Sequence, residues 1–95
     1  MVDKIEINYQ NKLIILDKKK QIFLVNAIKK DFKEELFNKL LNIMSLWKNN
    51  YSNNEIVDGI TFIIKIYTSS ELETIVIKND FPINFQEFLD ILGEL

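Results

Sequence analysis

The hydrophobic positions of the chain follow two different periods, and the longest periodic stretch has the period of a helix. Between Asp31 and Lys48 the apolar residues recur three and four positions apart, the spacing that gathers them on one face of an α-helix. Asp31 can cap the first free N–H groups while Glu34 reaches back toward it. The pattern predicts a helix over residues 31–48. Its apolar residues are Phe32, Leu36, Phe37, Leu40, Leu41, Ile43, Met44 and Trp47.

The residues before this helix predict three strands. Apolar and polar residues alternate from Lys4 to Tyr9, which indicates a strand with one buried face. A polar break follows, so Leu13 to Leu16 should return as an antiparallel strand, apolar on both faces. Gln21 to Val25 is rich in strand formers and predicts a third strand; an irregular approach to the helix is the alternative. Residues 26–30 should then connect to the helix, unless Asn26 caps it one turn earlier.

The second half of the chain predicts a loop, a hairpin and a final helix. The polar residues 48–55 include four asparagines, which is typical of a surface loop. Asp58 and Gly59 supply turn residues before two strands, Ile60 to Tyr67 and Leu72 to Lys78.

The final helix has a well-marked start. Asn84 is a natural N-cap with Glu87 three residues later, and Ile83 can pack on Phe88 as a hydrophobic staple. Gly93 can end the helix in a left-handed cap. The element order is therefore βββαββα. We expect an α+β fold with a single antiparallel sheet and two helices packed on one face.

Length and composition limit the class of protein. The chain has 95 residues, with no cysteine and no histidine, so we expect a single domain over residues 1–95. Disulfides and thiolate chemistry are excluded, and the usual general base near neutral pH is absent. We therefore expect a protein that is not an enzyme and that needs no cofactor and no metal. No leader or membrane segment is evident, which favours a cytoplasmic location.

Charge is divided unevenly along the chain. The net charge is −2, and all twelve basic residues are lysines. Lysines prevail in residues 1–48 and acids in residues 49–95. A rigid acidic surface would steer association with a basic protein partner, although solubility alone also explains exposed acids. The candidate partner-binding acids are Glu55, Asp58, Glu71, Glu73, Asp80, Glu87 and Asp90.

Half of the lysines lie within sixteen residues, and these form the candidate basic patch: Lys18, Lys19, Lys20, Lys29, Lys30 and Lys33. Such a patch could bind phosphate, but a solvated turn and helix start explain it as well. The absence of arginine argues against specific nucleic-acid recognition.

Two further interpretations remain open. Glu55, Asp58 and Asp80 could converge as a hard-metal site or an acid/base pair, although turn geometry alone also favours Asp at two of these positions. The strand from Leu13 to Leu16 needs cover on both faces, so the protein could be a monomer or a homodimer.

The second half also carries a pattern of W-x3-Y, then D-G-x2-F, then N-D-F-P-x-N-F. Its residues are Trp47, Tyr51, Asp58, Gly59, Phe62, Asn79, Phe81, Pro82 and Phe85. This pattern resembles small uncharacterised domains of low-GC bacteria, which are similar to immunity-type proteins encoded near toxins. The resemblance implies a non-enzymatic protein-binding inhibitor, most simply an immunity protein that masks a bacterial toxin. A phage-encoded inhibitor of a host defence nuclease, similar in action to an anti-CRISPR protein, is the first alternative. A nucleic-acid-binding module that uses the lysines is the second.

Overall fold

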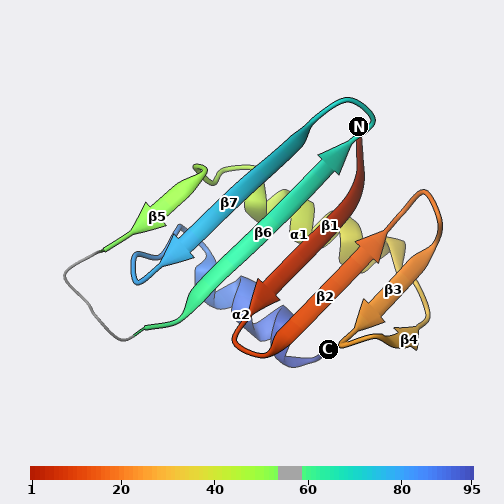
Figure 1. Ribbon diagram of the computed structural model, residues 1–95, viewed down its shortest axis with the longest axis horizontal. Helices are drawn as coiled ribbons and strands as arrows, with labels where there is room; N and C mark the ends of the chain where they lie inside the picture. The colour runs from red at the N-terminus through yellow and green to blue at the C-terminus, as the bar shows by residue number, and fades with distance from the viewer. Residues whose placement is uncertain (54–58) are drawn as a thin grey trace.

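One mixed β-sheet carries two helices on one of its faces (Figure 1) in the computed structural model, which describes residues 1–53 and 59–95. The strands are β1 Val2–Tyr9, β2 Lys12–Asp17, β3 Ile22–Val25, β4 Ile28–Lys30, β5 Asn50–Ser52, β6 Thr61–Thr68 and β7 Leu72–Lys78. The helices are α1 Glu34–Met44 and α2 Phe85–Gly93. The strand order across the sheet is β4-β3-β2-β1-β6-β7-β5. The predicted α+β class is confirmed. The predicted purely antiparallel sheet and the order βββαββα are wrong.

The two predicted hairpins form the centre of the sheet. β1 pairs with β2, and β6 pairs with β7, each in antiparallel register. β1 and β6 also pair with each other, so the two halves of the chain meet side by side (Figure 1). The tight turn after β1 takes its positive φ, 51°, at Gln10.

Residues 26–30 form a turn and the strand β4, Ile28–Lys30, which corrects the prediction of a connection to the helix. Asn26 and Ala27 adopt φ values of 50° and 67°, the left-handed pair that a two-residue hairpin turn requires. The Oδ1 atom of Asn26 accepts a hydrogen bond from the Leu13 amide at 2.8 Å, and the Asn26 amide donates to the Leu13 carbonyl at 2.9 Å. Asn26 is therefore a hairpin residue and not a helix cap.

Helix α1 is shorter than predicted at both ends. It begins at Glu34, after Lys33 in an extended conformation with no side-chain cap, so Asp31 is not its N-cap. The indole of Trp47 lies beyond the helix but is only 7% exposed. Its Nε1 donates to the Ile83 carbonyl at 2.8 Å, and its ring meets Phe88 edge-on with centroids 5.0 Å apart. This bond and this ring contact hold Trp47 against the start of α2.

The expected loop over residues 48–55 contains β5, a second correction. β5 runs parallel to β7, with Tyr51 opposite Ile77, and this pair makes the sheet mixed. A three-residue strand has little intrinsic stability, so its form depends on the neighbouring β7. The loop prediction at Asn54 and Glu55 lies outside the described residues, as does the Asp58 position of the predicted turn.

Helix α2 lacks the predicted capping interactions. Asn84 adopts a left-handed φ of 61° with no side-chain cap hydrogen bond, so the capping box with Glu87 is absent. Ile83 is 62% exposed, which excludes the staple with Phe88. Gly93 remains helical and has no positive φ. Pro82 is buried, and its carbonyl accepts a hydrogen bond from the Phe85 amide at 3.3 Å.

The core lies between the sheet and the two helices. Successive side chains of a strand point to opposite faces, so residues of one parity (odd-numbered or even-numbered) share a face. On each strand the residues of one parity point into the core, including Ile5 and Ile7 of β1 and Ile64 of β6, all at 0% exposure. Phe37 and Phe88 fill it from the two helices. No polar side chain among the described residues is buried. Most strand residues of the other parity face away from the helices. Val2 is an exception, because the β1–β6 register shifts between Val2 and Lys4 and Val2 packs against the core.

Candidate functional site

The face of the sheet without helices is the most extensive candidate surface, and we call it the open face. The strand registers place residues of the outward parity on it. Its apolar members are all exposed or half-buried: Leu13, Ile15, Ile22, Leu24, Ile63, Leu72 and Val76. When one face of a sheet packs on the core and the other faces only water, the residues on the water side are normally polar. This one mixes apolar and charged residues, as protein interfaces do.

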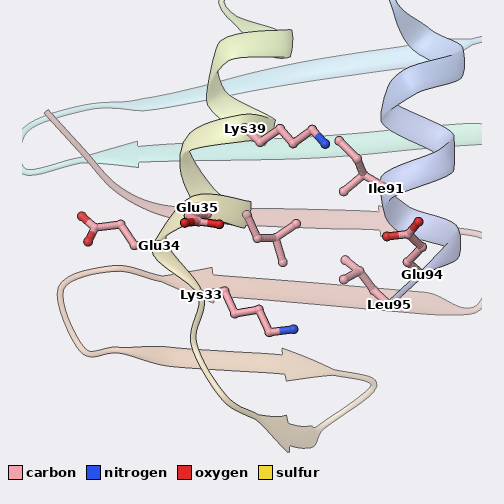
Figure 2. A pocket seen from close by; sticks show the side chains of 8 residues that line it. Lys33, Glu34, Glu35, Lys39, Ile91, Glu94 and Leu95 are labelled. Carbon is pink, nitrogen blue, oxygen red and sulfur yellow. The ribbon is translucent and has the colours of Figure 1, made fainter.

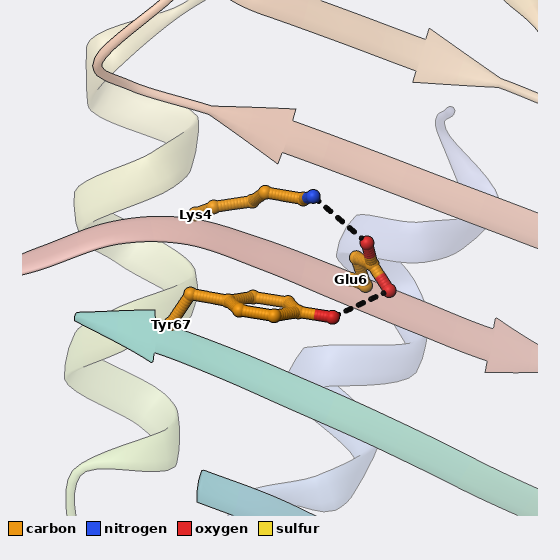
Figure 3. Close-up of polar contacts among 3 residues, drawn as sticks. All are labelled: Lys4, Glu6 and Tyr67. Atoms are coloured by element: carbon orange, nitrogen blue, oxygen red, sulfur yellow. Dashed lines mark hydrogen bonds and ion pairs between the residues drawn. The ribbon is translucent and has the colours of Figure 1, made fainter. Parts of the chain in front are cut away.

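A polar network joins the adjacent strands β1 and β6 on the open face (Figure 3). Lys4 and Glu6 are neighbours on the same side of β1, and their Nζ and Oε1 atoms are 3.0 Å apart. The Tyr67 hydroxyl on β6 donates to Oε2 of Glu6 at 3.2 Å. The Lys4 Nζ also lies 4.7 Å from the centroid of the Tyr67 ring. The network is made possible by the β1–β6 register, which sets Lys4 opposite Tyr67.

This network shifts two pKa values. The hydrogen bond to Glu6 is the main cause that raises the pKa of Lys4 above 10.5, against a lowering by partial burial. Burial is the main cause that raises the pKa of Tyr67 above 10.0, and the negative charge of Glu6 adds to it. At neutral pH Lys4 is therefore a cation and Tyr67 a neutral phenol.

A shallow depression of about 160 Å³ adjoins the network on the open face. Leu13 and Ile63 provide its apolar walls, while Glu6, Asn8 and Lys65 line it with polar groups. Aromatic and apolar surface beside a few fixed charges is the composition that anchors protein partners.

A groove of about 660 Å³ lies between the first turns of α1 and the end of α2 (Figure 2). Lys33 and Lys39 of the α1 side and Glu94 of the α2 side are among its lining residues. Glu34 extends on the other side of α1, where its Oε1 lies 3.3 Å from the Lys18 Nζ. The mixed charges suit a polar or charged segment, without the histidine or cysteine of common catalytic sites.

The predicted acidic face is divided among separate places. Glu71 precedes β7 and Asp80 follows it, so a strand of seven residues, about 20 Å long, separates them. Glu73 lies on β7 beside Glu71, while Glu87 and Asp90 are exposed on α2. The exposed residue Glu94 continues the α2 stripe. Glu55 and Asp58 lie outside the described residues.

The predicted basic patch is partly assembled. Lys18, at the start of the β2–β3 turn, points toward α1, with its Nζ 5.9 Å from the Phe37 ring. Lys19 and Lys20 are exposed in the same turn. Lys29 and Lys30 are successive residues of β4 and so point to opposite faces. Only Lys30 joins Lys33, in a recess of about 340 Å³ near the end of α2.

Sequence reasoning missed the network of Lys4, Glu6 and Tyr67. The alternation along β1 indicated that Lys4 and Glu6 share a face, but nothing local indicated that β6 would be the neighbour. The pairing of strands far apart in sequence decides which side chains meet.

Neither a metal centre nor a membrane helix is found in the part of the chain that the structure describes. Residues 1–53 and 59–95 contain no group of three or more His, Cys, Asp or Glu that could hold a metal ion. None of the described helices has the length and apolar character needed to cross a membrane.

No protein-family model, curated protein or solved structure matches this chain. The residues that carry the sequence resemblance include several that pack closely against other parts of the protein. Trp47 and Phe62 are buried in the core. Gly59 lies directly against the Asn79 side chain, which would have to move to admit a Cβ at this position.

Proposed function

We propose that this protein is a non-enzymatic binding protein that inhibits a macromolecule by masking it, most simply an immunity protein against a bacterial toxin. The observation that carries the proposal is the open face. Neither described helix lies over this face, which presents apolar side chains, Tyr67 and the paired Lys4 and Glu6 toward the exterior. A partner that covers this face would bury apolar area without breaking any core contact.

The rigidity of the open face suits inhibition by masking. Most of its side chains project from β1, β2, β3 and β6, each of which pairs with a strand on both sides. The Lys4–Glu6–Tyr67 contacts also hold three long side chains in place before any partner arrives. A surface that is ordered in advance loses less conformational entropy on binding. Tight binding is therefore possible without a large contact area.

The distribution of charge favours a basic partner. The outward stripe of α2 consists of Glu87, Asp90 and Glu94, all exposed, and α2 has no basic residue in its last turn. Glu71 and Glu73 lie at the start of β7. These acids lie on the helix side of the molecule and not on the open face, so they would act by raising the association rate with a basic toxin or nuclease.

The test is a pull-down with the tagged protein from extracts of its native host. Wild-type protein should recover one protein in stoichiometric amount. Ile63→Glu, which places a charge in the middle of the open face, should lose that protein. Leu46→Glu is the matched control, because Leu46 is 68% exposed and lies in the turn after α1. Recovery of no stoichiometric protein by the wild type would contradict the proposal.

The identity of the captured protein separates the two forms of the proposal. A toxin encoded beside this gene identifies an immunity protein, whereas a host defence nuclease identifies a phage inhibitor. The nucleic-acid alternative makes a different prediction. Its binding must weaken as salt rises and must be lost when Lys18, Lys19 and Lys20 are all changed to Glu.

A further inference from the structure

One edge of the sheet is only half covered. Among the described residues, the outer neighbour of β7 is β5, which pairs with Val76, Ile77 and Lys78. Figure 1 shows the first half of β7 running on beyond the end of β5 without a strand at its side. The uncovered segment, residues 72–75, is here called the free edge.

The backbone groups of the free edge point outward. The Thr68 amide donates to the Glu71 carbonyl at 2.9 Å, so the odd-numbered residues of β7 face β6. The Val76 amide donates to the Asn49 carbonyl, and the Lys78 carbonyl accepts from Asn53, so the even-numbered residues face away from β6. Leu72 and Thr74 share this parity. Each therefore directs one N–H and one C=O away from the sheet, ready to pair with another strand.

A hollow of about 330 Å³ lies beside the free edge on the helix side of the sheet. Leu41 and Met44 of α1 and Ile75 of β7 contribute apolar walls, and Glu73 contributes a carboxylate. A strand added beside β7 would turn every second side chain toward this side. The hollow could then receive an apolar side chain near Ile75.

The charges at the free edge identify the kind of occupant. Glu71 and Glu73 are both exposed and have the parity of the helix side. Two copies of the chain paired through their free edges would bring four of these carboxylates together, and this repulsion disfavours a homodimer there. A segment with lysine or arginine opposite Glu71 and Glu73 would be attracted instead.

We propose that the free edge of β7 binds an extended basic segment of the protein partner by strand addition. The segment pairs with the backbone of Leu72 and Thr74, sets basic side chains against Glu71 and Glu73, and seats an apolar side chain in the hollow beside Ile75. This inference rests on the proposed function, because it takes the partner to be a protein with a basic surface. It specifies where one segment of that partner binds.

A short peptide tests the proposal on the intact protein. The probe is the capped peptide Leu-Thr-Lys-Thr-Lys, whose antiparallel register sets its leucine opposite Ile75 and its lysines opposite Glu73 and Glu71. Both threonines then direct their amides to β7, and both lysines direct theirs away. N-methylation of the threonine amides should weaken binding on the order of tenfold, because two hydrogen bonds are lost. N-methylation of the lysine amides should leave binding nearly unchanged.

The binding site is located by amide chemical shifts and hydrogen exchange. The amides of Leu72 and Thr74 should shift and exchange more slowly when the peptide is added. Equal effects of the two methylation patterns would overturn strand addition, as would shifts confined to other surfaces. A peptide with glutamates in place of its lysines should fail to bind.

Two substitutions with matched controls test the same edge in the protein. Thr74→Pro removes the outward N–H, whereas Thr74→Val keeps it. Glu73→Lys reverses the charge at the free edge, whereas Glu87→Lys makes the same change on α2. Peptide binding should be lost in Thr74→Pro and Glu73→Lys and kept in Thr74→Val and Glu87→Lys. If Thr74→Pro does not fold, the methylated peptides still decide the question with wild-type protein.

The outcomes separate this inference from the proposed function. If the host partner is recovered equally by wild type, Glu73→Lys and Thr74→Pro, and the peptide leaves Leu72 and Thr74 unchanged, strand addition is wrong and the proposed function stands. If the peptide pairs with the free edge but wild type recovers no host protein, the proposed function is wrong and the edge still binds basic strands.

Discussion

The two faces of the sheet contain similar apolar residues but differ in how far those residues are exposed to solvent. Ile63 and Ile64 are neighbours on β6, yet Ile63 on the open face is 39% exposed and Ile64 on the helix side is 0% exposed. The helix side is closed by α1 and α2 and by rings such as Phe62, which meets Phe85 edge-on at 5.2 Å. The open face has its Lys4–Glu6–Tyr67 network, and neither described helix lies over it. Stability therefore resides in one face, and the other is available for a partner.

The largest effect is expected from shortening two neighbouring side chains of β6, one on each face of the sheet. Ile64→Ala should destabilise the protein by about 2–5 kcal/mol, because it removes buried methyl groups and leaves a cavity. Ile63→Ala should cost less than about 1 kcal/mol, because its side chain is already in partial contact with water. Urea unfolding measures both values. Equal losses would mean that the open face is part of the core in solution.

A smaller loss is expected for the indole hydrogen bond that ties the end of α1 to α2. Trp47→Phe keeps an aromatic ring but leaves the Ile83 carbonyl without its 2.8 Å partner. The expected cost is about 1–3 kcal/mol. The neighbouring change Leu46→Ala, at a residue that is 68% exposed, should stay within about 0.5 kcal/mol. Thermal unfolding of both variants and of wild type measures the two losses of stability.

The smallest effect is expected in the network of the open face, and it depends on pH. Tyr67→Phe should cost about 0.5–1 kcal/mol at neutral pH, the range of exposed polar pairs. The pKa values of Lys4 and Tyr67 are both raised in the folded protein, so the folded state holds these protons more strongly than the unfolded state. Their stabilising contribution is complete at neutral pH and is lost as the pH rises above about 10.

Denaturation midpoints measured between neutral and strongly alkaline pH check the direction of this effect. Wild type should lose stability more steeply above pH 10 than Tyr67→Phe, which has no phenol to ionise. Glu6→Gln should also flatten the decline, because it removes the interaction with Glu6 that raises the pKa of Lys4, and the negative charge that adds to the effect of burial on Tyr67. Parallel curves for the three proteins would mean that the network does not form in solution.

The elements with long periodic patterns were predictable because their own residues decide them. The strands over Lys4–Tyr9 and Leu72–Lys78 were indicated by alternation, and both helices by the three-and-four spacing of their apolar residues. The ends of the helices were harder. Asp31 and Asn84 looked like caps by residue type, but neither caps a helix by its side chain, because the chain enters each helix from a direction set by neighbouring elements.

The candidate site was less predictable than the fold. The acids and lysines were found by composition, but composition does not place them in space. Glu71 and Asp80 are nine residues apart in sequence and lie at opposite ends of a straight strand, whereas Lys4 and Tyr67 are sixty-three residues apart and in contact.

By itself the sequence determined the α+β class, the two central hairpins, both helices and the shortage of catalytic side chains, because these follow from residue type and local periodicity. Only the tertiary structure decided the strand order, the short strands β4 and β5, the network on the open face and the free edge of β7. The physical reason is that short strands and cross-strand contacts gain their stability from neighbours distant in sequence, and no local pattern specifies those neighbours.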